Sequence, residues 1–299
     1  MSKLITILGP TATGKTNIAV NLALELNAEI ISADSRQVYR SMDIGTGKDI
    51  NEYTIDGVKI PFHLIDIINA GEEYNLFTFL KDFHAAYQDI SDRSKQSILC
   101  GGTGLYLHGV LKGYEMKQVD KNDELRSDLA NKTDDELREI LLSKVKVHNT
   151  TDILSRPRLV RAIEIALEQN EYTTQTFPAV ESVIFGVYHD RQIVRDRITN
   201  RLKARIEEGM LEEVESLLNS GVSAEQLIRY GLEYKYLTQY IQGELSKDEM
   251  INLLNIAIHQ FSKRQMTWFR KMEREGINII WVDGTLEMKE KINFMKTKI

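Results

Sequence analysis

Cysteine and long apolar runs are almost missing from this chain of 299 residues. Its single cysteine, Cys100, excludes an internal disulfide, and its six histidines never cluster at the spacing of metal ligands. No stretch approaches the length of apolar residues that crosses a bilayer, and the N-terminus enters an apolar run without a charged leader. We therefore expect a soluble, globular, cytoplasmic protein that makes no membrane contact.

Positive charge is also in deficit, with a formal net charge of −6. This balance argues against a broad surface that coats nucleic acid. The basic residues nevertheless gather in three clusters, which are Arg156, Arg158 and Arg161; Arg191, Arg195, Arg197, Arg201, Lys203 and Arg205; and Lys263, Arg264, Arg270, Lys271 and Arg274. One such cluster is typical of a solvated helix face, whereas three together indicate a polyanionic partner larger than a nucleotide.

The chain does have a phosphate-binding signature, Gly9-Pro10-Thr11-Ala12-Thr13-Gly14-Lys15-Thr16, directly after the apolar run 4–8. It fits the pattern G-x-x-x-x-G-K-[ST], and a helical pattern follows it. Glycines let successive backbone N–H groups point at one spot, where Lys15 and the positive end of the helix add charge. We expect a site for a diphosphate or triphosphate, with the Thr16 hydroxyl on Mg²⁺. The alternative is a glycine-rich turn that only caps the helix.

Strand-like and helical segments alternate through most of the chain. The predicted strands are 4–8, 28–34, 62–67, 97–100, 182–188 and 277–282, and the predicted helices are 15–26, 75–90, 192–219 and 252–274. This alternation predicts an α/β fold, a P-loop NTPase-like parallel sheet covered on both faces by helices. Residues 115–181 are polar, charged and helical, with a strand signal only at 145–147. We predict a catalytic core of residues 1–114 and 182–299 with a mostly helical insertion domain, residues 115–181.

Two polar residues follow predicted strands at the edge of the sheet where ligands gather in such folds. Asp34 is either an ordinary helix N-cap or a carboxylate that ligates Mg²⁺ through water or accepts a proton. Thr103 lies in the turn Gly101-Gly102-Thr103-Gly104, where the glycines serve the turn and the hydroxyl can hydrogen-bond an anionic leaving group. The spacing alone leaves both alternatives open.

Seven motifs in this order strongly resemble the tRNA dimethylallyltransferase family of the bacterial type. They are the phosphate loop 9–16, Asp34-Ser35-Arg36-Gln37-Val38-Tyr39-Arg40, the runs 42–48 and 101–107, Arg158-Leu159-Val160-Arg161-Ala162-Ile163-Glu164, and the runs 197–201 and 263–270. The resemblance covers nearly the whole chain. It implies transfer of a dimethylallyl group from dimethylallyl diphosphate to N6 of an adenosine next to the tRNA anticodon, with Mg²⁺ and loss of diphosphate.

The resemblance also implies roles for individual residues. Asp34 would be the general base, and Thr103 would bind near the bridging oxygen of the prenyl diphosphate. Gly9 to Thr16 and Arg201 would hold the diphosphate. The anticodon arm of tRNA would be bound by Asp34, Ser35, Arg36, Gln37, Thr103, Arg126, Pro157, Arg158, Leu159, Val160 and Arg161. No obligate protein partner is evident, and we expect a monomer.

One departure from the family pattern lies at residues 229–235. Many members carry a short Gly-Tyr-Arg or Gly-Tyr-Lys motif where this chain reads Arg229-Tyr230-Gly231-Leu232-Glu233-Tyr234-Lys235. Two rival functions use the same phosphate loop. One is a prenyltransferase acting on free AMP or ATP, and the other is a small-molecule kinase or nucleotide-binding module.

Overall fold

The computed structural model describes residues 3–117, 119, 121–144, 155–167 and 174–299. The chain divides into two compact units. The first joins Met1–Gly113 to Pro178–Ile299, and the second is Tyr114–Phe177. None of the helices in these described ranges is both long and apolar enough to cross a membrane.

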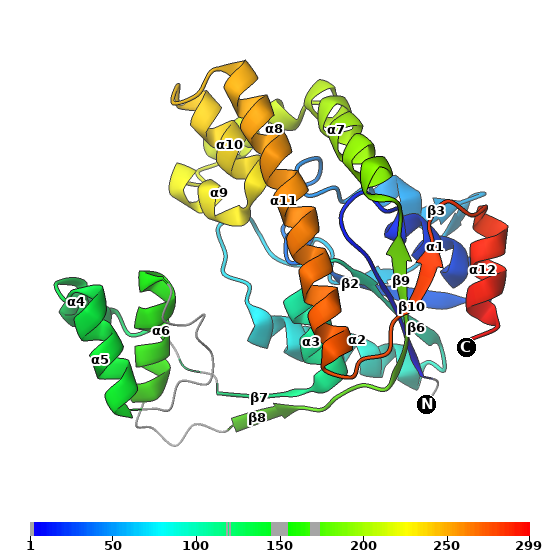
Figure 1. Ribbon diagram of the computed structural model, residues 1–299, viewed down its shortest axis with the longest axis horizontal. Coiled ribbons are helices and arrows are strands. Elements are labelled where there is room, and N and C mark those ends of the chain that lie inside the picture. The colour runs from blue at the N-terminus through cyan, green and yellow to red at the C-terminus, as the bar shows by residue number, and fades with distance from the viewer. Residues whose placement is uncertain (1–2, 118, 120, 145–154, 168–173) are drawn as a thin grey trace. The chain divides into compact units, whose positions relative to one another are not determined.

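Six parallel strands form the sheet of the first unit (Figure 1), in the order β10-β9-β1-β6-β2-β5. They are β1 (Leu4–Leu8), β2 (Ala28–Ala33), β5 (Phe62–His63), β6 (Gln96–Gly101), β9 (Ser182–Tyr188) and β10 (Ile280–Asp283). Every residue of β1 and β2 is buried, as expected for strands covered on both faces. The predicted α/β class with a parallel sheet is confirmed. The strand predicted at 62–67 is too long, because Leu64 and Asp66 adopt positive φ angles of 61° and 56°, which end the extended chain.

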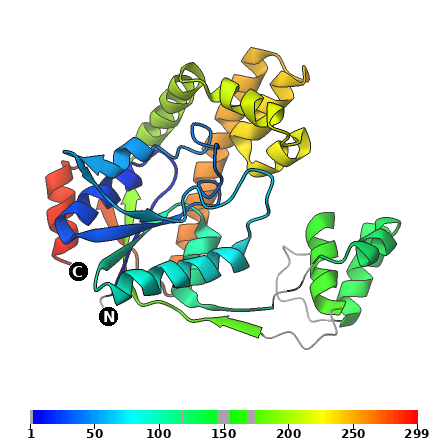
Figure 2. The same ribbon diagram turned by 180° about the vertical axis from the view of Figure 1, so that it is seen from behind.

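Helices cover both faces of this sheet. α1 (Lys15–Leu26) and α12 (Met288–Lys296) share one apolar core with Ile5 and Ile7 of β1. α2 (Leu76–Asp92) and α3 (Gly104–Lys112) pack together on the other face (Figures 1 and 2). A 3-10 turn, Ile50–Tyr53, and a short hairpin of β3 (Thr54–Ile55) and β4 (Val58–Lys59) lie beside α1.

A second apolar core holds the loop that follows β2. Val38, Tyr39 and Met42 of that loop are buried among helices from the C-terminal half of the chain. These helices are α7 (Arg191–Glu207), α8 (Met210–Asn219), α9 (Ala224–Tyr230), α10 (Leu232–Ile241) and α11 (Lys247–Arg274). The helices predicted over 192–219 are separated at Gly209, whose φ of 103° suits glycine and lies between the end of α7 and the start of α8. Packing against these helices therefore holds the loop that follows Asp34 in place.

The second unit contains α4 (Asp123–Ala130), α5 (Asp134–Lys144) and α6 (Arg156–Leu167). Its small core comprises Leu129, Leu137, Leu141, Leu159 and Ile163. It also contains an antiparallel pair, β7 (Tyr114–Lys117) and β8 (Thr174–Phe177), which the sequence analysis did not predict. Both strands are short and largely polar, and they pair although they lie at opposite ends of the insertion in the sequence. No local sequence pattern therefore predicts them. The strand signal at 145–147 lies outside the described residues.

Candidate functional site

The phosphate loop leaves β1 at Gly9 and enters α1 at Lys15. Ala12 and Gly14 adopt left-handed φ angles of 64° and 76°, and the Thr13 hydroxyl donates to the Pro10 carbonyl at 2.8 Å. A Cβ at Gly9 would lie 3.1 Å from the Val187 carbonyl oxygen, so this position has no room for a side chain. These two left-handed residues coil the backbone, and a coiled loop of this kind can direct N–H groups at an anion.

Two cations lie at the loop. The Arg201 guanidinium of α7 donates a hydrogen bond to the Thr11 hydroxyl. Burial and, after it, the neighbouring Arg205 lower the pKa of Arg201 to about 10, although Glu233 opposes them. Burial also lowers the pKa of Lys15, against the raising effect of the Asp34 carboxylate. Cations that are this desolvated attract an anion strongly, which fits a diphosphate.

The structure brings Asp34 and Thr103 together. β2 and β6 are neighbours in register, with Ala33 opposite Gly101, so the residues that follow them meet at the same edge of the sheet. The Thr103 hydroxyl accepts from the Ser35 backbone N–H at 3.1 Å, and Asp34 Oδ1 accepts from the Arg36 backbone N–H at 2.9 Å. One Asp34 carboxylate oxygen therefore has a fixed orientation beside Lys15.

Gln37 faces the protein. Its Oε1 accepts from the Ser32 hydroxyl at 3.1 Å, and its Nε2 donates to the Gly47 carbonyl at 3.1 Å. Ser35 and Arg36 are partly exposed, and the Arg36 side chain reaches the junction of α9 and α10.

Gln265 of α11 was quoted within a motif but given no role by the sequence analysis. Its Oε1 accepts from the Thr11 backbone N–H at 2.8 Å, and its Nε2 donates to the Gly102 carbonyl at 2.9 Å. One buried side chain thus connects the phosphate loop to the turn that carries Thr103. A Cβ at Gly102 would lie 2.4 Å from Gln265 Nε2, so the turn glycine is needed for this contact.

Two further acids near the loop were missed by sequence reasoning. Burial raises the pKa of Glu52 and of Glu233, while Arg201 and Arg205 oppose both shifts. Glu52 lies in a 3-10 turn inside a polar loop, and Glu233 lies in the segment that departs from the family pattern. That departure is the one feature of the sequence that could have drawn attention to Glu233.

The predicted tRNA-binding residues of the insertion have unequal surroundings. Arg126 and Arg161 both bind the buried Glu164 carboxylate, Arg126 with Nε at 2.6 Å and Arg161 with Nη1 at 3.0 Å. Burial opposes ionisation of Glu164, but the two arginines outweigh it and lower its pKa to about 2. Leu159 is buried in the core of this unit and Val160 is partly buried, whereas Pro157 and Arg158 are exposed. Arg158 is the cation of this set that projects into solvent.

Two of the three basic clusters meet in one pocket of 560 Å³ between α7 and α11. Arg191 and Arg195 come from α7, Lys263 and Arg270 come from α11, and Pro10 of the phosphate loop reaches its wall. Its floor includes the apolar side chains of Ile198 and Met266. This pocket is a concave cationic surface that suits a polyanion.

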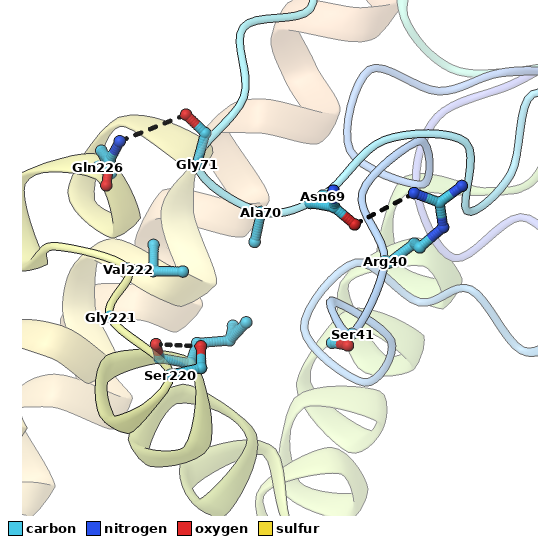
Figure 3. Close-up of a pocket in the computed structure, with 10 residues that line it drawn as sticks. Arg40, Ser41, Asn69, Ala70, Gly71, Ser220, Gly221, Val222 and Gln226 are labelled. Atoms are coloured by element: carbon cyan, nitrogen blue, oxygen red, sulfur yellow. Dashed lines mark hydrogen bonds between the residues drawn. The ribbon is translucent and has the colours of Figure 1, made fainter.

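A second pocket, of 420 Å³, lies where the loop at Asn69–Gly71 faces α8 and α9 (Figure 3). Arg40 Nη1 donates to Asn69 Oδ1 at 3.1 Å, and Gln226 Nε2 donates to the Gly71 carbonyl at 3.3 Å. None of the residues that line it belongs to the phosphate loop. It is therefore separate from the diphosphate site.

The surroundings of Thr16 fit a magnesium ion that takes some of its ligands from the phosphate groups of a substrate. Thr16 is in the first turn of α1 and is partly exposed, and Asp34 lies close enough to Lys15 to act on its pKa. Within the described ranges, no group of three or more His, Cys, Asp or Glu side chains is placed to hold a metal ion. A cation here would rely on substrate oxygens and water, as Mg²⁺ does when it binds with phosphates.

Comparison with known proteins gives consistent matches over the full chain. The IPP transferase family matches residues 37–272, and the isopentenyl transferase family matches residues 2–59. The tRNA dimethylallyltransferase 2 of Bacteroides fragilis is 55% identical, covering 99% of this chain and 97% of that protein. The tRNA dimethylallyltransferase 1 of Parabacteroides distasonis is 54% identical, covering 97% of this chain and 95% of that protein. The crystal structure of tRNA isopentenylpyrophosphate transferase from Bacillus halodurans has a TM-score of 0.70 and 32% identity, covering 100% of this chain and 97% of that one.

Proposed function

The chain belongs to the IPP transferase family, and from this premise we propose that it is a tRNA dimethylallyltransferase. It transfers a dimethylallyl group from dimethylallyl diphosphate to the N6 amine of an adenosine next to the tRNA anticodon, and it releases diphosphate. The high identity to tRNA dimethylallyltransferases over nearly the whole chain supports the reaction class. We place the enzyme in the cytoplasm because that is where its tRNA substrate is modified.

One observation carries this assignment. Asp34 and Thr103 converge beside a phosphate loop whose neighbouring cations, Lys15 and Arg201, are desolvated. A proton acceptor, a hydroxyl and an anion cradle at one sheet edge supply what prenyl transfer to an amine needs. A kinase also uses a carboxylate near its phosphate site, so the choice of prenyl transfer over phosphoryl transfer rests on the family match.

Asp34 acts on the acceptor. The N6 lone pair of adenine is delocalised into the ring, so the amine must lose a proton as its new bond to carbon forms. The new N–C bond replaces the bond between that carbon and the diphosphate oxygen, and the Asp34 carboxylate takes the proton. The hydrogen bond from the Arg36 N–H at 2.9 Å orients Asp34 for this task.

The phosphate loop acts on the leaving group. Negative charge grows on the diphosphate as the carbon–oxygen bond breaks, and Lys15, Arg201 and the loop N–H groups stabilise it. Thr103 holds the bridging oxygen. Thr16 would be the protein ligand of Mg²⁺, and the bound ion would supply positive charge that offsets part of the same negative charge. The allylic carbon is reactive toward water, so the reaction needs a site that excludes water once the substrates are bound.

The tRNA partner explains the basic clusters. The target base leaves its stack to reach Asp34, as bases of single-stranded loops readily do. The pocket formed by Arg191, Arg195, Lys263 and Arg270 offers cations to the RNA backbone beside the phosphate loop. The exposed Arg158 offers another from the insertion.

The test is incubation with Mg²⁺, dimethylallyl diphosphate and unmodified tRNA, with AMP and ATP as acceptors in parallel, followed by mass analysis of nucleosides. We expect a prenyl adduct on tRNA adenosine and little on free nucleotide. An adduct chiefly on AMP or ATP would retain the chemistry and replace the acceptor. ATP consumption without any adduct would indicate that the chain is a kinase and not a prenyltransferase.

A further inference from the structure

We propose that Tyr230 is a positioning residue that sets the direction of the Arg36 side chain, so that its guanidinium is held ready for an RNA phosphate. The inference rests on the proposed function, because it concerns how tRNA is bound. It gives a role to the segment Arg229–Lys235, where the chain departs from the family pattern. Tyr230 itself would not contact the substrate.

The Arg36 side chain is held at the junction of α9 and α10. Its Nη2 donates to the Arg229 backbone carbonyl at 3.4 Å, and its guanidinium carbon lies 6.0 Å from the centre of the Tyr230 ring. The aromatic face attracts the cation, and the carbonyl accepts one of its donors. Other guanidinium N–H groups stay available for a phosphate, because arginine has five donors.

Tyr230 can fix the arginine because it is itself immobile. It is only 7% exposed, and its ring centre lies 4.5 Å from that of Tyr39. Its hydroxyl accepts from the Gly71 backbone N–H at 2.5 Å and donates to the Glu72 carbonyl at 3.4 Å. Packing and two hydrogen bonds thus hold one ring in place against the arginine.

Gly231 sets the backbone path at this junction. It has a φ of 141°, which side chains rarely allow, and it connects α9 directly to α10. A Cβ there would lie 3.5 Å from Arg36 Nε, an ordinary van der Waals contact, so the φ angle and not lack of space calls for glycine.

The link extends to the catalytic carboxylate. The backbone N–H of the same Arg36 donates to Asp34 Oδ1, so RNA held by the Arg36 side chain is held two residues from the proposed base. An arginine fixed before binding loses less side-chain freedom when RNA arrives. The Tyr230 ring therefore contributes to tRNA affinity through Arg36.

The experiment is a double-mutant cycle on tRNA binding by the full chain, measured over a series of salt concentrations. Arg36→Ala, Tyr230→Leu and the double variant are compared with wild type, and Tyr240→Leu, a partly buried tyrosine of α10, is the matched control. Loss of one phosphate contact lowers the slope of log K against log salt by about 0.7. We expect that loss for Arg36→Ala and most of it for Tyr230→Leu, with no further loss in the double variant and none in Tyr240→Leu.

Additive losses in the double variant would overturn the proposal, as would an unchanged slope in Tyr230→Leu or in Arg36→Ala. Tyr230→Phe covers the case in which Tyr230→Leu does not fold, because it keeps the ring and loses only the hydroxyl. It should keep most of the wild-type slope, because the ring still packs against Tyr39, and a loss equal to that of Arg36→Ala would refute a role for the ring. Assaying prenylation by wild type in the same preparations tests the proposed function separately, since binding and adduct formation are distinct readouts.

Discussion

Replacing Gln265 with leucine should weaken both the fold and the diphosphate site. The side chain satisfies the Thr11 N–H and the Gly102 carbonyl at 2.8 and 2.9 Å. Gly102 is buried, so its carbonyl loses a partner that water does not replace, at a cost of about 2 kcal/mol. Thr11 is partly exposed, so its N–H is partly rehydrated, and about 1 kcal/mol is lost there. The free energy of unfolding should fall by about 3 kcal/mol.

Denaturant unfolding measures that loss, and Gln260→Leu on the exposed face of the same helix is the matched control. Diphosphate affinity, measured by calorimetry, should fall about tenfold, because the Thr11 N–H no longer holds the loop in its binding form. Gln265→Glu separates the two contacts. It keeps an acceptor for Thr11 but sets a carboxylate oxygen against the Gly102 carbonyl. A change below 0.5 kcal/mol for Gln265→Leu would refute this reasoning, since surface substitutions alone reach about that size.

Four other substitutions test other parts of the structure. Hydrogen bonds from Arg93 lower the pKa of Glu29 to about 2, below its ordinary 4.5, so its stabilisation is present above pH 4.5 and is lost as pH falls toward 2. Urea unfolding should thus show Glu29→Gln less stable than wild type at pH 6, with a gap that narrows by pH 3; a constant gap would contradict the ion pair. Arg158→Ala should lower the salt slope of tRNA binding without changing the melting temperature. Arg161→Ala should also lower the melting temperature, because the buried Glu164 carboxylate loses one of its partners. Equal melting temperatures for the two variants would contradict this contrast. Glu213 accepts hydrogen bonds from three backbone N–H groups of the loop after β2. Glu213→Ala should therefore lower the free energy of unfolding in guanidinium by about 2–4 kcal/mol. A negligible change would show that water replaces these hydrogen bonds.

The sheet and the phosphate loop could be predicted because their signals are local. A β-branched run before Gly9 and a helical period after Lys15 specify strand, loop and helix without reference to the rest of the chain. The convergence of Asp34 with Thr103 also follows from parallel strands, whose carboxyl ends share one edge.

The rest depends on contacts between distant residues. Gln265 lies in a helix more than 250 residues from Thr11, and no periodicity indicates that its amide faces inward toward a loop. Arg126 and Arg161 look like RNA-binding cations in the sequence, yet both bind the buried Glu164 in the structure. β7 and β8 pair across the entire insertion. In each case the role of a residue or strand depends on what it contacts, and the sequence of one segment does not identify that distant contact.

The central claim is that Asp34 removes the N6 proton while the phosphate loop holds the diphosphate. Single-turnover prenylation of tRNA by wild type and Asp34→Ala, together with the diphosphate affinity of each, tests it most directly. The account predicts a fall in rate of about 10²–10⁴-fold with diphosphate affinity nearly unchanged. Equal losses of rate and affinity would contradict it and would make Asp34 a structural cap of the loop.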